Sequence, residues 1–328
     1  MAVQGGTVRP GSVLRPPMAA DFLAKATHAR IGIVLAAIGI MVAMVSFIGS
    51  TVNAANIADD GAGGTTVAAY NAWTFGISTA GLAFAKLGIA LILWGIVRRL
   101  WIRVESTKVG LAKLVPYVDG KGDPAGLSGT NPYLSVTVTR TAPDAYPIHK
   151  MAFKLWSPML VMGAMLVTAG VVFSLIEAAA GADGNTADFL TYSALAQGTE
   201  FFGEALLLAG ISLLLGSILG SLRQGGGEVQ ESLGLAVKTP IMPGTAKLFV
   251  ALMAIGLMGA MLQFVLYLFV AGEDNPATIS AWFAWLGPLR EASLGLMLSG
   301  IVLALATIGT KVLPFQFLRI QEMIRNGK

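Results

Sequence analysis

The stretch FGISTAGLAFAKLGIALILWGIV, from Phe75 to Val97, decides the fold class of this chain. It is long enough to cross the hydrocarbon core of a bilayer as a helix, which takes about 20 residues for about 30 Å. Lys86 is the single charged residue in it. The run predicts a transmembrane helix and raises the question of what a lysine does near its middle.

The composition places the whole chain in a membrane. Of its 328 residues 55% are hydrophobic and only 12% are charged, whereas about a quarter of the residues of a soluble domain are charged. Backbone in lipid must satisfy its own hydrogen bonds, and the apolar runs are too long for barrel strands. We therefore predict an all-α integral membrane protein, a six-transmembrane helical bundle with spans at 31–49, 75–97, 155–177, 201–222, 248–271 and 289–311.

Basic residues predict the orientation of the bundle. All but two of the 22 Lys and Arg residues lie before the first span, between the second and third, between the fourth and fifth, or at or after the end of the sixth. By the positive-inside rule both termini are cytoplasmic, in a plasma membrane or a bacterial inner membrane. The two exceptions are Lys86, within a span, and Arg290, on the opposite side.

The outer segments are acidic. They carry, at or beside the loops, Asp59, Asp60, Glu177, Asp183, Asp188, Glu200, Glu273, Asp274 and Glu291. This surface favours a cationic or basic partner, or it is a solvated surface that lacks Lys and Arg for topological reasons. Because the net charge of +4 arises on the cytoplasmic segments, we expect no nucleic-acid partner.

The spans and the polar segments between them predict seven regions. They are a flexible N-terminus with a short basic amphipathic helix (1–30), three transmembrane hairpins (31–97, 155–222 and 248–311), two cytoplasmic loops (98–154 and 223–247) and an amphipathic tail (312–328). In the first loop YLSVTVTR, Tyr133–Arg140, alternates as a strand does. Pro314 predicts a break or bend at the start of the tail.

An internal repeat links the hairpins. The pattern Gly-Ile-x-Leu-x-Leu-x-x-Ile starts at Gly88, Gly210 and Gly300, in the even-numbered spans. AIGIMVAMVSF from Ala37 matches AIGLMGAMLQF from Ala254 in odd-numbered spans, and the third span keeps a weaker trace in GAMLVTAGVVF from Gly163. We predict three parallel pseudo-repeats related by rotation about an axis near the membrane normal.

Small residues are expected to hold the helices together, because lipid-embedded helices associate through close packing. The glycines that we expect at helix contacts are Gly39, Gly88, Gly210, Gly256 and Gly300.

Several kinds of chemistry have no support in the sequence. The chain has no Cys and two His, and both His lie in polar flanks, so we expect no metal site and no haem. The loops contain no phosphate-binding glycine motif and no nucleophile with a nearby base. We therefore expect no cofactor and no enzymatic activity.

Lys86 remains the best lead to function, because a lysine in a span usually faces the bundle interior, a water cavity or an acidic partner. Glu204 and Glu291, each about one turn into a span, are candidate partners, with Ser212 or a water as a bridge. The lysine either fixes the order of the hairpins through an ion pair or handles protons or ions.

Two functions follow from these alternatives. The first is a non-catalytic integral membrane subunit or scaffold that organises a larger membrane complex with other membrane subunits. The second is a small transporter or ion pathway whose central cavity is lined by Lys86, Glu204, Glu291, Thr168, Gln263 and Ser212. A transporter needs a hydrated path to the midplane, whereas a scaffold is packed along its axis.

Overall fold

A computed structural model describes residues 27–60, 64–114 and 136–326. The elements are α2 (Thr27–Asp60), α3 (Thr65–Leu114), β1 (Val136–Thr139), α4 (Pro147–Ala182), α5 (Thr186–Ser232), β2 (Val237–Pro240), α6 (Gly244–Val270), α7 (Pro276–Thr307), the π-helical turn η2 (Ile308–Val312) and α8 (Leu313–Asn326). Six of these helices are long and apolar enough to cross a membrane. The prediction of a helical bundle with six membrane-length helices is confirmed.

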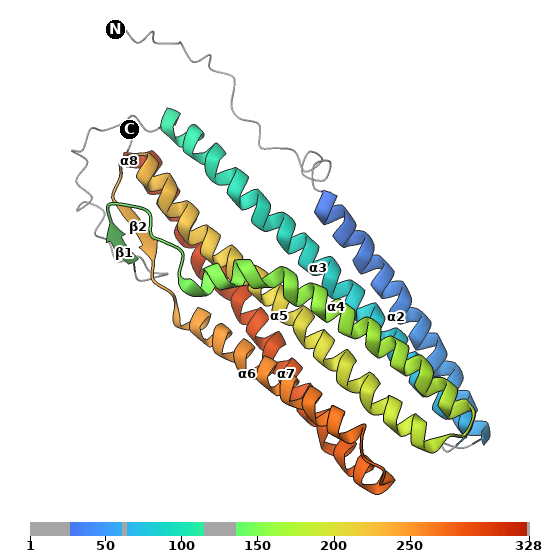
Figure 1. Ribbon diagram of the computed structural model, residues 1–328. Helices are drawn as coiled ribbons and strands as arrows, with labels where there is room; N and C mark the ends of the chain where they lie inside the picture. Colours follow the sequence, from blue (N-terminus) through green and yellow to red (C-terminus); the bar gives the residue numbers. More distant parts are fainter. Residues whose placement is uncertain (1–26, 61–63, 115–135, 327–328) are drawn as a thin grey trace.

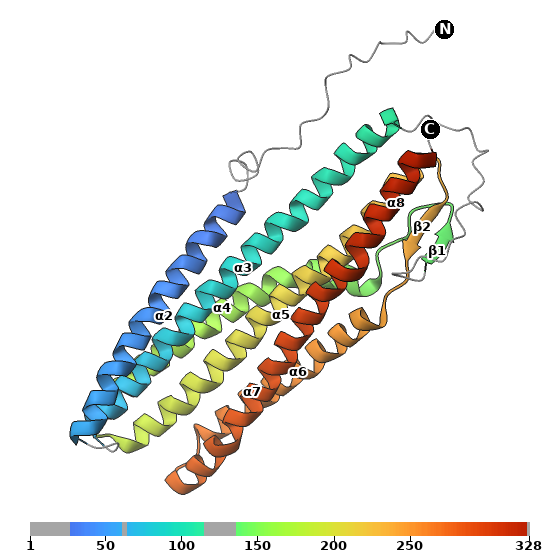
Figure 2. The same ribbon diagram turned by 180° about the vertical axis from the view of Figure 1, so that it is seen from behind.

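The helices run side by side as three antiparallel pairs, α2 with α3, α4 with α5, and α6 with α7 (Figure 1). The three connections within these pairs lie at one end of the bundle, which we call the turn end. The opposite end, which carries β1 and β2, is the strand end; α2 begins and α8 ends there, as the view from behind also shows (Figure 2).

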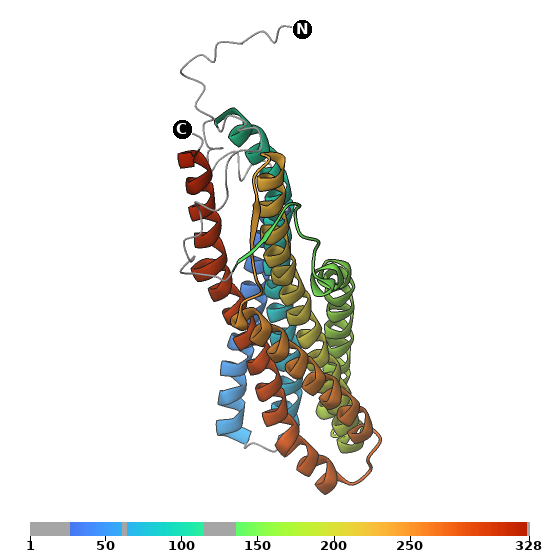
Figure 3. The ribbon, with the colours of Figure 1, turned by 90° about the vertical axis from the view of Figure 1, so that its left-hand side faces the viewer.

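Helix α5 is the axis of the bundle. It packs against α3, α4, α6 and α7, and in its most apolar window 72% of the residues are buried, against 17–28% in the other five spans. Within the described residues α3 and α7 form no packed pair of their own, so the hairpins are arranged in a row with α5 at its centre (Figure 1). Figure 3 shows the same bundle with α6 and α7 toward the viewer. This differs from a closed ring of three hairpins, in which the first would pack against the third.

A buried stripe recurs at every seventh position of the outer helices α2 and α7, with small and polar residues in α2 and with large apolar residues as well in α7. In α2 the buried residues include Gly32, Gly39, Ser46 and Asn53; in α7 they are Ile279, Leu286, Ser293, Gly300 and Thr307 among others. A seven-residue repeat keeps one stripe on the neighbouring helix at a shallow crossing angle. Because the remaining faces are apolar too, hydrophobicity alone does not reveal which face is inside.

Helices α3 and α5 continue furthest beyond the predicted spans. Helix α3 extends to Leu114, past the predicted end at Val97, and α5 extends from Thr186 to Ser232, beyond both ends of 201–222. Hydropathy shows where the apolar residues end, whereas a helix ends where its backbone hydrogen bonds end. Therefore the segment predicted as a loop from residue 98 begins as helix.

The strand that the sequence predicts within 133–140 is present as β1. It pairs antiparallel with β2, with Val136 opposite Pro240 and Thr139 opposite Val237. Residues 133–135 and the N-terminal segment to residue 26 lie outside the described residues. The ribbon joins the two segments that the sequence treats as separate cytoplasmic loops.

Of the predicted break or bend at Pro314, the break is absent: the helical course continues through this residue, directly after a π-helical turn. The chain passes from α7 through η2 into α8, where Pro314 is the second residue, a position that tolerates a missing backbone N–H. The buried residues of α8 are Phe315, Arg319 and Met323. Its inner face therefore packs on protein.

The strand-end part of α5 (Arg223–Ser232), the β1–β2 ribbon and α8 form a folded unit that we call the head. Its centre is the buried Gln230, whose amide nitrogen donates to the backbone oxygens of Gly226 and Lys238, both at 2.9 Å. The Gln230 Oε1 atom accepts from the Lys238 backbone N–H at 2.9 Å and from Arg319 Nε at 2.8 Å. One side chain thus connects α5, β2 and α8.

Candidate functional site: a charged cluster on the bundle axis

Lys86 reaches the central helix. Its Nζ atom lies 2.7 Å from Oε1 of Glu204 on α5. The second oxygen of the same carboxylate, Oε2, lies 3.3 Å from a terminal nitrogen of Arg290 on α7. The Glu204 side chain is 2% exposed, so one buried carboxylate binds two cations from the two outer hairpins.

The two side chains meet without a bridge because their helices begin outside the apolar runs. Helix α3 starts at Thr65, so Lys86 lies about 32 Å along it from the turn end, and Glu204 lies about 27 Å along α5. If depth is counted instead from the start of the apolar run at Phe75, the depth of Lys86 is too small. The difference in depth between Lys86 and Glu204 is then too large for direct contact.

Arg290 completes the cluster, and the sequence reading did not assign it a role. Its guanidinium group stacks on the Phe201 ring, 3.6 Å from the centroid. One terminal nitrogen also lies 3.9 Å from Glu291, whose side chain is 76% exposed. Glu291 therefore lies at the rim of the cluster beside Arg290. The signal that could have identified Arg290 is its position as the one basic residue at the far end of the spans.

Glu200 lies one helical turn from Glu204 and is fully buried. The Ser174 hydroxyl of α4 donates to its Oε1 at 3.2 Å, while within the described residues its Oε2 has no hydrogen-bond partner. The glutamate fits because α4 has Gly170 at this level, where a Cβ would collide with the Glu200 side chain.

Two of the acidic residues expected on an outer surface are buried. Glu177 is 6% exposed, near the end of α4, and Glu200 is 0% exposed, inside α5. The prediction of an acidic outer surface is wrong for these two, because α5 begins at Thr186 and places Glu200 well inside a helix. The side chains of Asp59 and Asp60 lie outside the described residues.

The other polar residues expected around Lys86 make contacts elsewhere. Gln263 donates from Nε2 to the Leu286 backbone oxygen at 2.9 Å and so links α6 to α7. Ser212 donates to the Leu208 backbone oxygen at 2.8 Å and lies 3.2 Å from the Met253 sulfur. Thr168 donates to the Ala164 backbone oxygen in its own helix.

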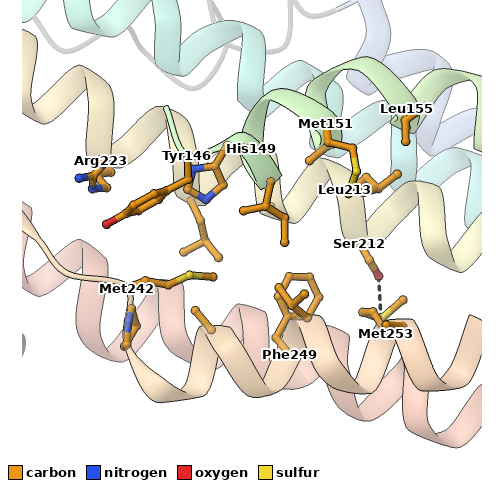
Figure 4. A pocket seen from close by; sticks show the side chains of 18 of the residues that line it. Tyr146, His149, Met151, Leu155, Ser212, Leu213, Arg223, Met242, Phe249 and Met253 are labelled. Carbon is orange, nitrogen blue, oxygen red and sulfur yellow. Dashed lines mark hydrogen bonds between the residues drawn. The ribbon is translucent and has the colours of Figure 1, made fainter. Parts of the chain in front are cut away.

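Apolar side chains fill the axis beyond the cluster. From Ala205 to Ile211 every residue of α5 is buried. A cavity of about 370 Å³ lies further toward the strand end, between α4, α5 and α6, and begins at Ala209 (Figure 4). The buried turn from Ala205 to Leu208 separates it from Glu204 along α5. In the part of the chain that the structure describes, no group of three or more His, Asp or Glu residues could hold a metal ion.

Comparisons with protein-family models, with curated proteins and with solved structures found no match to this chain. The functional assignment therefore depends on the geometry.

Proposed function

We propose that this chain is a non-catalytic integral membrane subunit that organises a larger membrane protein complex. The observation that carries the proposal is the closed charged cluster on a packed axis. Glu204 is buried between Lys86 and Arg290, and the α5 residues that follow it are covered by other helices. Such an arrangement fixes three hairpins against one another and leaves little room for a solute path.

The parts of the molecule outside the spans supply surfaces for partners. Helix α3 has 50 residues and α5 has 47, about 75 and 70 Å of helix, which is more than twice the hydrocarbon thickness. The head at the strand end is a folded unit built on the α5 extension. A rigid arm and a folded head are suited to holding other subunits at a defined distance from the membrane.

The glycine contacts support three copies of one hairpin unit, with both termini cytoplasmic as the basic residues indicate. A Cβ at Gly39, Gly163 or Gly256 would meet, respectively, the Gly81, Gly203 or Ser293 backbone oxygen of the second helix in the same hairpin, at 2.5–2.8 Å. When the three hairpins are aligned on the glycines that start the repeated pattern, Gly81, Gly203 and Ser293 occupy equivalent positions. Seven residues further along the first helix, Ser46 and Gln263 donate to the equivalent backbone oxygens of Thr74 and Leu286.

One observation favours the alternative, a small transporter or proton pathway around Lys86. Within the described residues, Oε2 of Glu200 and Nε of Arg290 are buried without partners, so the cluster has a spare acceptor and a spare donor. The row of buried carboxylates Glu177, Glu200 and Glu204 leads from the turn end toward Lys86. A proton could use such a row only if water reached it.

The experiment that separates the two functions is native purification of the tagged chain in a mild detergent, followed by mass measurement of the intact particle. A subunit is expected in a particle heavier than one 34.0 kDa chain, with other integral membrane polypeptides in fixed ratio. A solitary chain that is stable in detergent would count against the proposal.

A further inference from the structure

The cavity between α4 and α6 is a groove in the lipid-facing side of the bundle. Helices α4 and α6 each pack against α5 but form no packed pair with each other in the described part of the chain, so α5 is the floor between two walls. Met151 is 50% exposed and Ile241 is 43% exposed at its edges, which leaves the groove open toward the hydrocarbon.

The groove has the length of one leaflet. It runs along α5 from Ala209 to Arg223, which is about 21 Å of helix, and one leaflet with its head groups is about 20–22 Å thick. Its lining is almost entirely apolar and includes the flexible side chains of Met151, Met159, Met242 and Met253. Methionine adapts to an irregular guest, so this lining suits an aliphatic chain.

Polar groups gather at the strand-end mouth of the groove (Figure 4). The Arg223 guanidinium lies 4.2 Å from the Tyr146 ring centroid. Its Nε donates to the Pro240 backbone oxygen at 3.3 Å and one terminal nitrogen donates to the Asp144 backbone oxygen at 3.1 Å. These bonds use two of the five N–H donors of an arginine. Beside it, His149 has a buried Nδ1 without a partner among the described residues.

The charge at this level is positive. Lys150 and Lys154 on the first two turns of α4 and Lys247 on the first turn of α6 are exposed at the strand-end level of the two walls, against the exposed acid Asp144 beside Arg223. Arginine and lysine bind phosphate oxygens strongly, arginine with a planar fork of donors. A head group placed here is therefore favoured when it carries a negative charge.

We propose that this groove binds one acyl chain of an anionic phospholipid from the leaflet at the strand end, with the phosphate at Arg223. A transmembrane helix of a partner is the competing occupant. The cavity of about 370 Å³ extends over about 21 Å of α5 and is therefore narrow; its shape is closer to that of a single aliphatic chain than to that of a helix, which is about 10–12 Å wide with its side chains. The volume suits an aliphatic chain.

The test uses Gly216, which lines the groove and has room for a side chain. A Cβ there meets only the Ala152 Cβ, at the ordinary contact distance of 3.6 Å, so Gly216→Leu is expected to place its side chain in the groove. Gly295→Leu is the matched control, because a Cβ at Gly295 has nothing within 4 Å. A second pair of variants is Arg223→Gln with the exposed Arg140→Gln as its control.

The purified chain is measured by native mass spectrometry and by thermal unfolding in micelles that contain phosphatidylglycerol or phosphatidylcholine with the same acyl chains. We expect the wild type and the Gly295→Leu control to retain one more phosphatidylglycerol than Gly216→Leu, and to gain more in Tm from phosphatidylglycerol than from phosphatidylcholine. Arg223→Gln is expected to lose this preference while Arg140→Gln keeps it.

Three outcomes would overturn the lipid site. They are equal retention of the two lipids by the wild type, unchanged lipid retention in Gly216→Leu, or loss of a bound polypeptide instead of a lipid in that variant. If Arg223→Gln fails to fold, the Gly216 and Gly295 pair still decides.

Discussion

At the scale of single residues, Glu204 has the largest structural role among the charged groups. A buried charge pair is a weak source of stability, but removing one partner leaves the other charged and desolvated, which costs about 3–5 kcal/mol. Glu204 is the shared partner of two cations, Lys86 at 2.7 Å and Arg290 at 3.3 Å. Its loss therefore affects both outer hairpins at once.

The first prediction concerns this carboxylate. Glu204→Gln is expected to destabilise the folded protein by about 3–5 kcal/mol, because Lys86 and Arg290 both lose their anionic partner. Glu291→Gln is the matched control, since the Glu291 side chain is 76% exposed, and it is expected to change stability by about 0–1 kcal/mol. Thermal unfolding in one detergent measures both, and equal Tm values for the two variants would contradict the role of Glu204.

The sequence identified part of this cluster. Lys86 stands out as a charge within an apolar run, and Glu204 follows as a candidate partner because it is an acid near the start of another span. Arg290 and Glu200 were assigned to the outer boundary, because apolar runs mark where lipid contact begins and not where a helix begins. Only the helix starts at Thr65 and Thr186 show which side chains share a level.

At the scale of the elements, close backbone approach sets the hairpins. A Cβ added at Gly163 of α4 would lie 2.8 Å from the Gly203 backbone oxygen and 2.9 Å from the Leu207 backbone nitrogen of α5. Backbone atoms cannot move away as the end of a flexible side chain can. The glycine at this position therefore determines how near α4 lies to α5.

The second prediction uses two glycine-to-alanine changes with opposite signs. Gly163→Ala is expected to lower Tm because α4 must move away from α5. Gly295→Ala has open space and is expected to leave Tm unchanged or raise it, since alanine is the better helix former by up to about 1 kcal/mol. If both variants unfolded at the same temperature, close packing at Gly163 would not be what holds the hairpin.

The third prediction concerns the head. Gln230→Leu removes the acceptor of the Lys238 N–H and of Arg319 Nε, along with two donated bonds. The α8 helix is then expected to detach, so that trypsin cleaves after Arg319 at least several times faster. Gln224→Leu is the control, because the Gln224 amide donates to Glu228 in the same helix and, within the described residues, connects no other element. Equal cleavage rates would mean that Gln230 does not hold the head.

Existence and type of the long elements follow from the sequence, whereas their ends and their packing do not. Six apolar runs predict six spans, and alternation in 133–140 predicts β1, because both signals are local. The partner of β1, residues 237–240, is far away in the chain. The row of hairpins around α5 also depends on contacts between distant residues, and the apolar outer faces of the helices carry no signal for it.

At the scale of the whole molecule, the row of hairpins has a mechanical consequence. Since α3 and α7 form no packed pair in the described residues, the first and third hairpins are linked through α5. Glu204 makes this link through its two ion pairs, and the Phe201 ring makes it through contacts with Phe75 and Tyr267. The charge at the centre therefore couples the outer hairpins in addition to the packing around it. Protons or ions could pass this charged group only if water replaced the apolar residues that follow it on α5.

The fourth prediction therefore compares ion flux with stability in the same variants. Proteoliposomes with the wild type are expected to show the proton and cation flux of protein-free vesicles. Lys86→Met is expected to leave that flux unchanged and to lower Tm, whereas the exposed Arg140→Met control leaves both unchanged. Flux in the wild type above that of empty vesicles, lost in Lys86→Met and kept in Arg140→Met, would contradict the account and assign the cluster to transport.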